Sequence, residues 1–117
     1  MTEIAHITSV EEWESQKDTG MYTAPSLESQ GYIHLSRKEQ VCGTLNRWFK
    51  TSDSVLLLLI DSEKIQASSK LVYEAPDGNH DSELTFPHLY GPLNVSAVTG
   101  TQLVTRESGS EWKLEFN

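Results

Sequence analysis

The chain has 117 residues, the length of one ordinary domain, and its 17 acidic and 9 basic side chains give a formal net charge of −8. This balance argues against duplex nucleic acid or an anionic membrane as a partner, because both require a basic surface. The single cysteine, Cys42, excludes an internal disulfide and a cysteine-based zinc site, and no signal peptide or membrane-length apolar run is visible. We therefore expect one domain, residues 1–117, in the cytoplasm.

The first 30 residues predict a strand, a helix and a loop. Residues 3–8 alternate between apolar and polar side chains, which is typical of a strand. Ser9 and Glu12 form a capping box, which predicts a helix over about residues 10–17. Residues 21–30 show no clear period, so we expect a surface loop there.

A second strand and a second helix follow. Residues 31–35 predict the strand, and Ser36 with Glu39 predicts another capping box. The helix that follows has an apolar stripe of Val41, Leu45, Trp48 and Phe49. Ser36 therefore has two candidate roles, as a helix cap and as a polar group in a site.

The remaining segments are mostly short strands and turns. In chain order they are a strand buried on both faces (54–61), a helical turn (62–65), a strand (70–74), a polar turn with His80 (76–81), a half-strand with an aromatic turn (83–92), a helical turn (94–98) and a closing hairpin (103–106 with 112–116). Helices that precede most of the strands indicate an α+β fold with a small mixed or antiparallel sheet, rather than a doubly wound parallel sheet. The predicted core contains Trp13, Leu45, Phe49, Leu56, Leu58, Ile60 and Val72.

Three histidines are the most informative side chains. His6 and His34 lie in predicted strands, each two residues before a hydroxyl, and His88 lies in the predicted aromatic turn. Because alternate side chains of a strand share a face, the first two imidazoles each lie beside the hydroxyl of Thr8 or Ser36. We predict that the three imidazoles converge on one concave pocket, with the two hydroxyls at its rim.

Several catalytic motifs are absent from the sequence, among them the glycine-rich dinucleotide loop, the P-loop and the nucleophile elbow. His34 and Ser36 are two residues apart on one strand, about 6 to 7 Å between Cα atoms, which is a poor geometry for a Ser–His general-base pair. A hydrolase with a catalytic triad is therefore disfavoured.

Segments between about residues 4 and 98 resemble one known family, in the same order along the chain. They are His6-Ile7-Thr8, Ala24-Pro25-Ser26-Leu27, Gly31-Tyr32-Ile33-His34-Leu35-Ser36, Glu39-Gln40, Asn46-Arg47-Trp48-Phe49, the apolar strand 55–61 and Phe86-Pro87-His88-Leu89-Tyr90-Gly91-Pro92-Leu93. The family is the small bacterial one known only as domain of unknown function 952. It is grouped by fold with the ADP-ribosyltransferases, so the resemblance implies a small split-sheet fold whose relatives bind NAD in a cleft.

The resemblance also implies roles for individual residues. His6 and Thr8 match a first-strand element that holds the ribose in those enzymes, and Tyr32 matches a tyrosine that stacks on nicotinamide. Glu83 is the nearest acid to a late glutamate that polarises a ribose hydroxyl, and His88 stands where a catalytic acid is expected. An imidazole lacks the fixed negative charge of a carboxylate, but it can act as a general acid or base near neutral pH.

Three hypotheses for the function follow, and the first is favoured. The first is a site that binds NAD or a related nucleotide, with ADP-ribosyl-transfer-like chemistry. The second is a non-catalytic module that binds a small ligand or a partner. The third is a zinc or nickel site made by the three imidazoles. The sequence places no carboxylate next to any of them, which counts against this hypothesis because metal-bound imidazoles are commonly held by a carboxylate. The sequence leaves the oligomeric state open.

The residues predicted to form the site share chemistry rather than proximity in the sequence. The candidate catalytic residues are His6, His34 and His88, and the candidate ligand-binding residues are Thr8, Tyr32, Ser36, Arg47 and Tyr90. The guanidinium of Arg47 can clamp a phosphate, and the alternative for this residue is an exposed position on the second helix.

Overall fold

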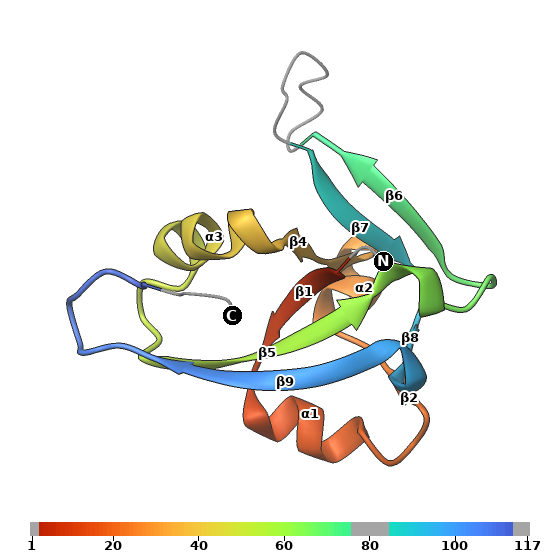
Figure 1. Ribbon diagram of the computed structural model, residues 1–117, viewed down its shortest axis with the longest axis horizontal. Helices are drawn as coiled ribbons and strands as arrows, with labels where there is room; N and C mark the ends of the chain where they lie inside the picture. Colours follow the sequence, from red (N-terminus) through yellow and green to blue (C-terminus); the bar gives the residue numbers. More distant parts are fainter. Residues whose placement is uncertain (1–2, 76–84, 114–117) are drawn as a thin grey trace.

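The computed structural model describes residues 3–75 and 85–113, and these form an α+β fold of antiparallel sheets and short helices, as predicted (Figure 1). The larger sheet has the strand order β4 (Ser36–Arg37), β1 (Glu3–Thr8), β5 (Ser54–Asp61), β9 (Val98–Thr105). A second sheet has the order β3 (Ile33–His34), β7 (Phe86–Tyr90), β6 (Lys70–Glu74), and a separate pair joins β2 (Met21–Tyr22) to β8 (Leu93–Asn94). The helices are α1 (Val10–Gln16), α2 (Pro25–Gln30) and α3 (Val41–Trp48), with 3-10 turns at η1 (Lys38–Gln40), η2 (Ser62–Lys64) and η4 (Val95–Ala97).

The central strand β5 is buried on both faces, as its apolar sequence predicts. Leu56, Leu58 and Ile60 point into a first core, whose buried members also include Ile4, Tyr22, Ala24, Ile33, Leu35, Leu89, Leu93 and Ala97. Val55 and Leu57 point into a second core with Ala5, Val41, Leu45, Val104 and Trp112. Figure 1 shows α3 above the β5–β9 ribbons and α1 below them. Each fully buried leucine contributes roughly 1.5 to 3 kcal/mol, so the two cores together hold the sheet in place.

Apart from Val72, the predicted core residues are confirmed with a gradation in burial. Leu45, Leu56, Leu58 and Ile60 are buried, whereas Trp13 and Phe49 are half-buried and pack against the first and the second core respectively. The prediction is wrong for Val72, which is half-buried on β6 but pairs with His88 on the outer face, while its neighbour Leu71 packs against the first core.

The cap of α1 is confirmed at atomic detail. The Ser9 hydroxyl accepts a hydrogen bond from the Glu12 amide at 3.1 Å, and Glu11 and Glu12 lie in the first turn, where the helix dipole favours negative charge. The helix ends where the Lys17 amide donates to the Trp13 carbonyl. Local sequence is therefore sufficient to define this helix.

The loop predicted over residues 21–30 is wrong, because this segment contains β2 and α2. Pro25 occupies the first turn of α2, where its missing amide hydrogen costs nothing. Gly31 ends the helix in the left-handed conformation, with φ of 90°. A proline that begins a helix and a glycine that ends one account for the apparent loop composition.

The second capping box is also wrong. Arg37, not Ser36, precedes the first turn, and the Arg37 amide donates to the Gln40 side-chain carbonyl at 2.9 Å. Ser36 lies in β4, is buried and pairs with Ala5 of β1. The pairing of β4 with β1 thus takes precedence over the local cap.

The half-strand predicted ahead of the aromatic turn is present but longer than expected, because β7 runs to Tyr90 between β3 and β6 and the turn follows it. Pro87 has no amide hydrogen and so cannot donate a hydrogen bond to a neighbouring strand. It lies just beyond the last β3–β7 pair, His34 with His88, and there its carbonyl accepts a hydrogen bond from the Leu35 amide.

The predicted closing hairpin is wrong as well. β9 pairs with β5, and Trp112 lies in no strand. The polar turn with His80, the candidate acid Glu83 and the end of the hairpin after residue 113 lie outside the described residues.

Candidate functional site

Polar and aromatic side chains gather on the outer face of the second sheet. The side chains of Ile33 and Leu89 point inward to the first core and are fully buried. Strand alternation therefore directs their neighbours His34, His88 and Tyr90 to the opposite face. Together with Tyr32 and Glu74, these three residues form what we call the aromatic face.

The rings of the aromatic face contact one another closely. The Tyr32 ring stacks on the His88 ring, with centroids 4.1 Å apart and an interplanar angle of 20°. His34 meets His88 edge-on at 5.5 Å, and Tyr90 lies 5.3 Å from Tyr32. Paired aromatic rings of this kind hold each other in place, and within the group only Tyr32 and His88 lie nearly parallel.

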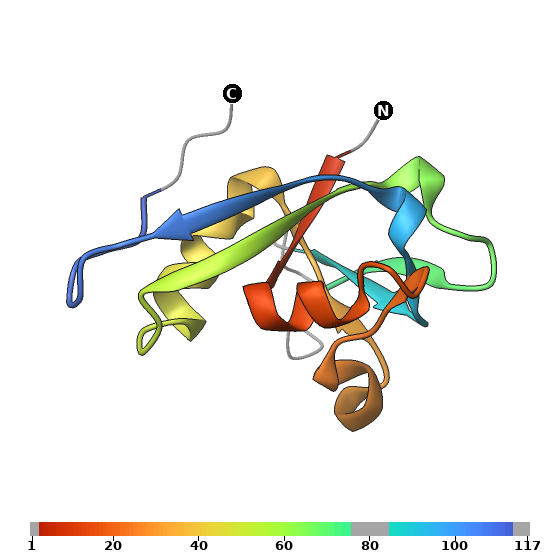
Figure 2. The same ribbon diagram turned by 90° about the horizontal axis from the view of Figure 1, so that it is seen from below.

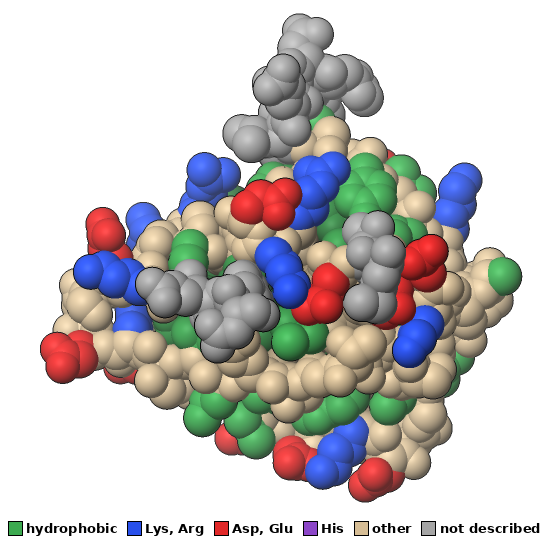
Figure 3. All heavy atoms as spheres, viewed as in Figure 1, with side chains coloured by type: hydrophobic (Ala, Val, Ile, Leu, Met, Phe, Trp, Pro, Cys, Tyr) green, Lys and Arg blue, Asp and Glu red, His purple; other side chains and the backbone are tan. Residues whose placement is uncertain are grey.

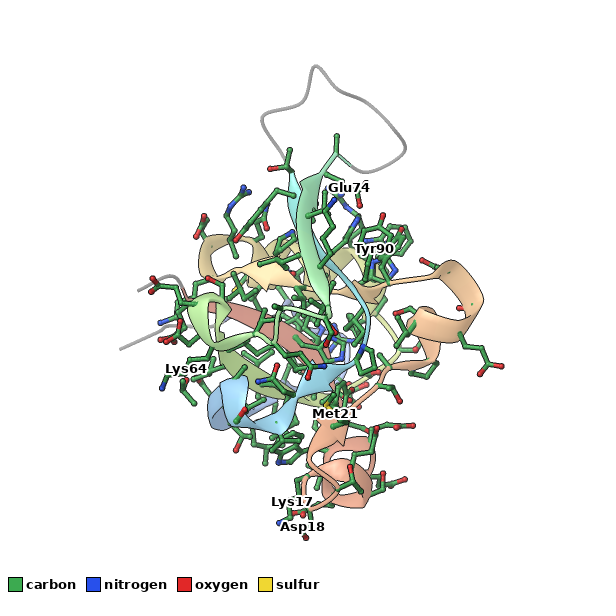
Figure 4. The ribbon with its side chains drawn as sticks, turned by 90° about the vertical axis from the view of Figure 1, so that its right-hand side faces the viewer. Lys17, Asp18, Met21, Lys64, Glu74 and Tyr90 are labelled. Carbon is green, nitrogen blue, oxygen red and sulfur yellow. The ribbon has the colours of Figure 1, made fainter. Side chains whose placement is uncertain are left out.

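Glu74 orients two of these rings from the neighbouring strand β6. Its Oε1 accepts hydrogen bonds from His88 Nδ1 at 3.0 Å and from the Tyr90 hydroxyl at 2.5 Å. Figure 4 shows Glu74 and Tyr90 on the same side of the β6–β7 ribbon. Because the proton of the neutral His88 ring is then on Nδ1, the lone pair lies on Nε2, which is the nitrogen that can accept a proton.

The electrostatics of this group follow from its hydrogen bonds. The hydrogen bonds from Tyr90 and then from His88 lower the pKa of the Glu74 carboxyl. The same carboxylate raises the pKa of the Tyr90 hydroxyl to about 12. At neutral pH Glu74 is therefore an anion, and Tyr90 is a protonated donor.

His34 completes the aromatic face at its β3 side. Its Nε2 donates to the Gln30 side-chain carbonyl at 2.6 Å, which ties the imidazole to the end of α2. Partial burial lowers the pKa of His34, and the neighbouring His88 adds to the effect. The ring is consequently a neutral group at pH 7.

His6 lies beneath the surface and not on this face. Its Nδ1 donates to the backbone carbonyl of His34 at 2.7 Å, and its Nε2 lies 2.9 Å from the Tyr22 hydroxyl. Burial lowers the pKa of His6 to about 4, so its ring is neutral at physiological pH. The predicted common pocket of three imidazoles is therefore wrong for His6, which supports β3 from below.

Neutral His6 also sets the direction of the buried hydrogen bonds. A carbonyl only accepts, so Nδ1 carries the proton and Nε2 accepts from Tyr22. The Tyr22 oxygen lies 2.8 Å from the Thr8 hydroxyl oxygen. Because Tyr22 has already donated its one proton to His6, its oxygen acts as the acceptor in this second hydrogen bond. Thr8 is thus part of an internal chain from β1 to β3.

Ser36 and Arg47, two predicted ligand-binding residues, lie away from the aromatic face. Ser36 pairs with Ala5, whose side chain belongs to the second core, so Ser36 faces the opposite side of the larger sheet from His6. Arg47 is exposed on α3, a helix that packs on the second core. Both residues lie apart from the histidines because β4 pairs with the larger sheet and α3 packs against that sheet, not against the second one.

The metal hypothesis is wrong for the described residues, among which no group of three histidine, cysteine or acidic side chains is placed to hold a metal ion. Both ring nitrogens of His6 are engaged in the internal chain. A shallow hollow lies between α1 and α2, away from the histidines, and is lined by Glu12, Gln16, Thr23, Ala24, Pro25, Leu27 and Glu28.

Sequence reasoning missed Glu74, Gln30 and Tyr22. Glu74 is the last residue of the strand predicted at residues 70–74, where side-chain alternation puts it on the same face as Val72. Only the pairing of β6 with β7 brings the Glu74 side chain to His88. Gln30 and Tyr22 lay in the segment taken for a loop. No local signal connects either of them to a histidine.

The fold and the site define a small α+β protein with an imidazole–tyrosine–carboxylate cluster on a sheet surface. The chain belongs to the family described as Protein of unknown function (DUF952), whose model matches residues 7–101. This confirms the family that the sequence motifs indicate. No curated protein matches the chain.

Solved structures of one bacterial protein are similar to this chain over nearly its whole length. The crystal structure of protein CC0527 from Caulobacter crescentus is 31% identical, with a TM-score of 0.79 over 96% of this chain and 94% of that chain. The solution NMR structure of CC0527 is 34% identical, with a TM-score of 0.74 over 92% of this chain and 89% of that chain. In the part of the chain that the structure describes, no helix has the length and apolar character needed to cross a membrane.

Proposed function

We propose that the aromatic face binds a small ligand with a planar heteroaromatic ring, and that the ligand is of the nucleotide class. The observation that carries this proposal is the stack of Tyr32 on His88, with His88 held by the Glu74 carboxylate. A flat ring surface with a fixed donor and acceptor pattern is suited to a planar polar ring, because stacking supplies affinity and the hydrogen bonds supply orientation.

NAD is the first candidate, in keeping with the expected fold grouping of the family with ADP-ribosyltransferases. The Tyr32 and Tyr90 rings fit its nicotinamide ring, and the register that pairs Lys70 with Tyr90 places one cation beside them for a phosphate. When bound, NAD supplies a scissile bond at a ribosyl carbon.

In this proposal His88 and Glu74 have different catalytic roles. Nε2 of His88 would accept the proton of an acceptor hydroxyl as that oxygen bonds to the ribosyl carbon and the bond to nicotinamide breaks, while Nδ1–H stays hydrogen-bonded to Glu74. The Glu74 carboxylate stabilises the imidazolium that forms, and it supplies the fixed negative charge that an imidazole lacks. Glu74 therefore takes the role of candidate acid for which the sequence offered Glu83.

Binding is tested by thermal shift and calorimetry with NAD, ADP-ribose, AMP and nicotinamide. A ligand present at about 100 times its dissociation constant adds roughly 2.7 kcal/mol to the free energy of unfolding. Tyr32→Leu is expected to weaken binding at least tenfold. Glu111→Gln, which changes an exposed carboxylate in the C-terminal segment, is the control and should bind as the wild type does. If none of the four compounds shifts the melting temperature at millimolar concentration, the nucleotide proposal is wrong.

Catalysis is tested separately, by release of nicotinamide from NAD. Glu74→Gln preserves the shape of the side chain and removes its charge, so it is expected to lower the rate at least tenfold while binding changes less. His88→Gln removes the base and should have a similar effect. Equal rates in the wild type and both variants would show that the release does not occur on this face.

A non-catalytic binding module is the second candidate, and the openness of the aromatic face favours it. Tyr90 and His34 are exposed on the sheet surface. Enclosure is what most catalytic sites use to exclude water. Tight binding of a nucleotide without any turnover would establish this candidate over the first.

A further inference from the structure

Glu74 has a second carboxylate oxygen that its neighbours on the aromatic face leave available. The His88 ring and the Tyr90 hydroxyl both donate to Oε1, and no described residue donates a hydrogen bond to Oε2. The Glu74 side chain is 38% exposed, so solvent reaches the carboxylate. Because two hydrogen bonds hold the group in place, Oε2 has a fixed position beside the rings.

The negative charge of Glu74 is not balanced by a cation among the described residues. No described Lys or Arg side chain forms an ion pair with it, and its partners are an uncharged hydroxyl and an imidazole. Arg37 lies over the ring of Tyr73, which strand alternation places on the opposite face of β6. Figure 3 shows a different arrangement on another side of the molecule, where Lys and Arg side chains lie next to most of the Asp and Glu side chains.

Lys70 is the other fixed charge on the strands of the aromatic face. It lies at the opposite end of β6 from Glu74, four residues away. This spacing corresponds to about 13 Å, which exceeds the Debye length of about 8 Å in physiological salt. The aromatic face therefore has an anionic end at Glu74 and a cationic end at Lys70.

Tyr90 supplies an accessible ring next to the anionic end. It is 39% exposed, and its hydroxyl donates to Glu74. Donation of a hydroxyl proton to a carboxylate increases the electron density of the phenol ring, and the negative face of such a ring attracts cations. A positive charge above Tyr90 is thus favoured both by the ring and by the nearby carboxylate.

The rest of the molecule adds to this preference. The net charge of −8 attracts cations and repels anions. His34 adds no competing positive charge at pH 7, because partial burial lowers its pKa. Figure 2 shows α2, whose Gln30 holds His34, on the opposite side of the molecule from β9, so the larger sheet leaves the aromatic face open.

We propose that the aromatic face selects ligands whose planar ring is itself a cation, such as an N-alkylated pyridinium or purine, and that Glu74 determines this specificity. The inference rests on the proposed function, because it concerns the ring that the aromatic face binds. The ring lies on Tyr90 with its positive charge near Oε2 of Glu74, and an anionic group of the same ligand points toward Lys70. An uncharged ring of the same shape gains the stacking but not the attraction between charges.

The test compares two ring compounds of the same shape, of which one is charged. 1-Methylnicotinamide is a permanent cation, and 3-methylbenzamide has a carbon in place of its ring nitrogen while it keeps the methyl and amide groups. Titrations of the full chain, followed by 1H–15N NMR at pH 7.5, give both dissociation constants. We expect the cation to bind about fivefold more tightly, as for a cation over an exposed aromatic ring. Nicotinate, which is an anion, should bind most weakly.

Two variants assign the preference to Glu74. Glu74→Gln removes the charge and keeps a carbonyl oxygen that can accept from Tyr90 and His88, so the two compounds should bind it within about twofold of each other. Glu111→Gln makes the same change in net charge at an exposed position of the C-terminal segment and should keep the fivefold difference. The NMR spectra also check that both variants keep the fold.

The outcomes separate this inference from the proposed function. Equal binding of the two compounds to the wild type overturns the inference and leaves the ring site intact. A preference that Glu74→Gln reduces no more than Glu111→Gln does overturns it as well. If neither compound binds but a nucleotide does, the inference fails alone, and if no ring compound and no nucleotide binds, both proposals fail.

Discussion

His6 illustrates what burial does to one residue. Both of its ring nitrogens are satisfied, by the His34 carbonyl and the Tyr22 hydroxyl, so the neutral ring is stable in the core. A second proton on Nε2 would face the hydroxyl proton of Tyr22 and would place a charge in an apolar environment. On the aromatic face, by contrast, the His34 ring is exposed, whereas His88 is only 8% exposed beside Tyr32.

The pH dependence of stability tests this state of His6. Its folded pKa of about 4 lies below the ordinary value of 6.5, so between these pH values the unfolded chain binds more protons than the folded one. The free energy of unfolding is therefore highest above pH 6.5 and falls as the pH drops toward 4, by roughly 3 kcal/mol for a shift of this size. Urea denaturation at pH steps from 4 to 8 measures the slope.

His6→Phe is the matched variant for that experiment. It lacks a titrating ring, so its stability is expected to be lower at pH 7, where two polar groups lose their partner, but to depend less on pH. An unchanged slope in this variant would contradict the assignment of the pH dependence to His6.

Glu74→Gln tests the carboxylate on the aromatic face. The pKa of Tyr90 is raised to about 12 mainly by its hydrogen bond to Glu74, so loss of the charge should bring the Tyr90 pKa back toward 10. A 13C NMR titration of the tyrosine Cζ resonances follows this residue separately from the other tyrosines. Glu111→Gln serves as the control, and an equal change in both variants would show that the carboxylate is not the cause.

At the scale of elements, α2 shows how a short helix is defined by its ends. Its first turn begins at Pro25, and Gly31 ends it with φ of 90°, a conformation in which a side chain is strained. No neighbouring atom lies within 4 Å of a Cβ added at Gly31, so the cost of a substitution there comes from the backbone alone.

A pair of glycine substitutions tests this reasoning. Gly31→Ala is expected to lower the free energy of unfolding by about 1 kcal/mol, because alanine disfavours positive φ. Gly43→Ala in α3 meets no atom within 4 Å either, but its position is helical. We expect it to raise stability by up to about 1 kcal/mol, through helix propensity. Thermal or urea denaturation compares the two, and effects of the same sign would contradict the account.

At the scale of the whole molecule, a segment beyond the family match closes the second core. Trp112 is 2% exposed, its amide donates to Asn46 at 2.7 Å, and its indole N–H donates to the Phe49 carbonyl at 3.0 Å. The Arg106 guanidinium stacks over the ring at 5.0 Å. The chain after β9 is thereby anchored to the end of α3.

Trp112→Ala is expected to cost about 3 to 5 kcal/mol, since it leaves a large cavity and removes the hydrogen bond to the Phe49 carbonyl. Trp48→Ala is the matched control, because Trp48 is 73% exposed at the end of α3 and should change stability by about 0.5 kcal/mol at most. Urea denaturation measures both. A small loss for Trp112→Ala would mean that the second core is complete without this segment.

The sequence by itself determined the elements whose signals are contiguous. The apolar run of β5, the alternation of β1 and the cap at Ser9 each lie within a few residues, and each appears as predicted. The stripe of α3 is also local, although Trp48 belongs to it by spacing and is nevertheless exposed. The sequence is enough to predict an element when the residues that determine it all lie within one strand or one turn of helix.

Only the tertiary structure decided the site. His34 and His88 become neighbours because β3 pairs with β7, and Glu74 reaches them because β6 pairs with β7 on the other side. The same pairings make a strand of the proline-bearing segment, and the pairing of β4 with β1 places Ser36 on the other face of the larger sheet. Strand register couples segments far apart along the chain, and a shift of one residue would reverse every side chain. The residues next to each histidine in the sequence therefore do not reveal which imidazole lies in the core and which lies on the outer face of the second sheet.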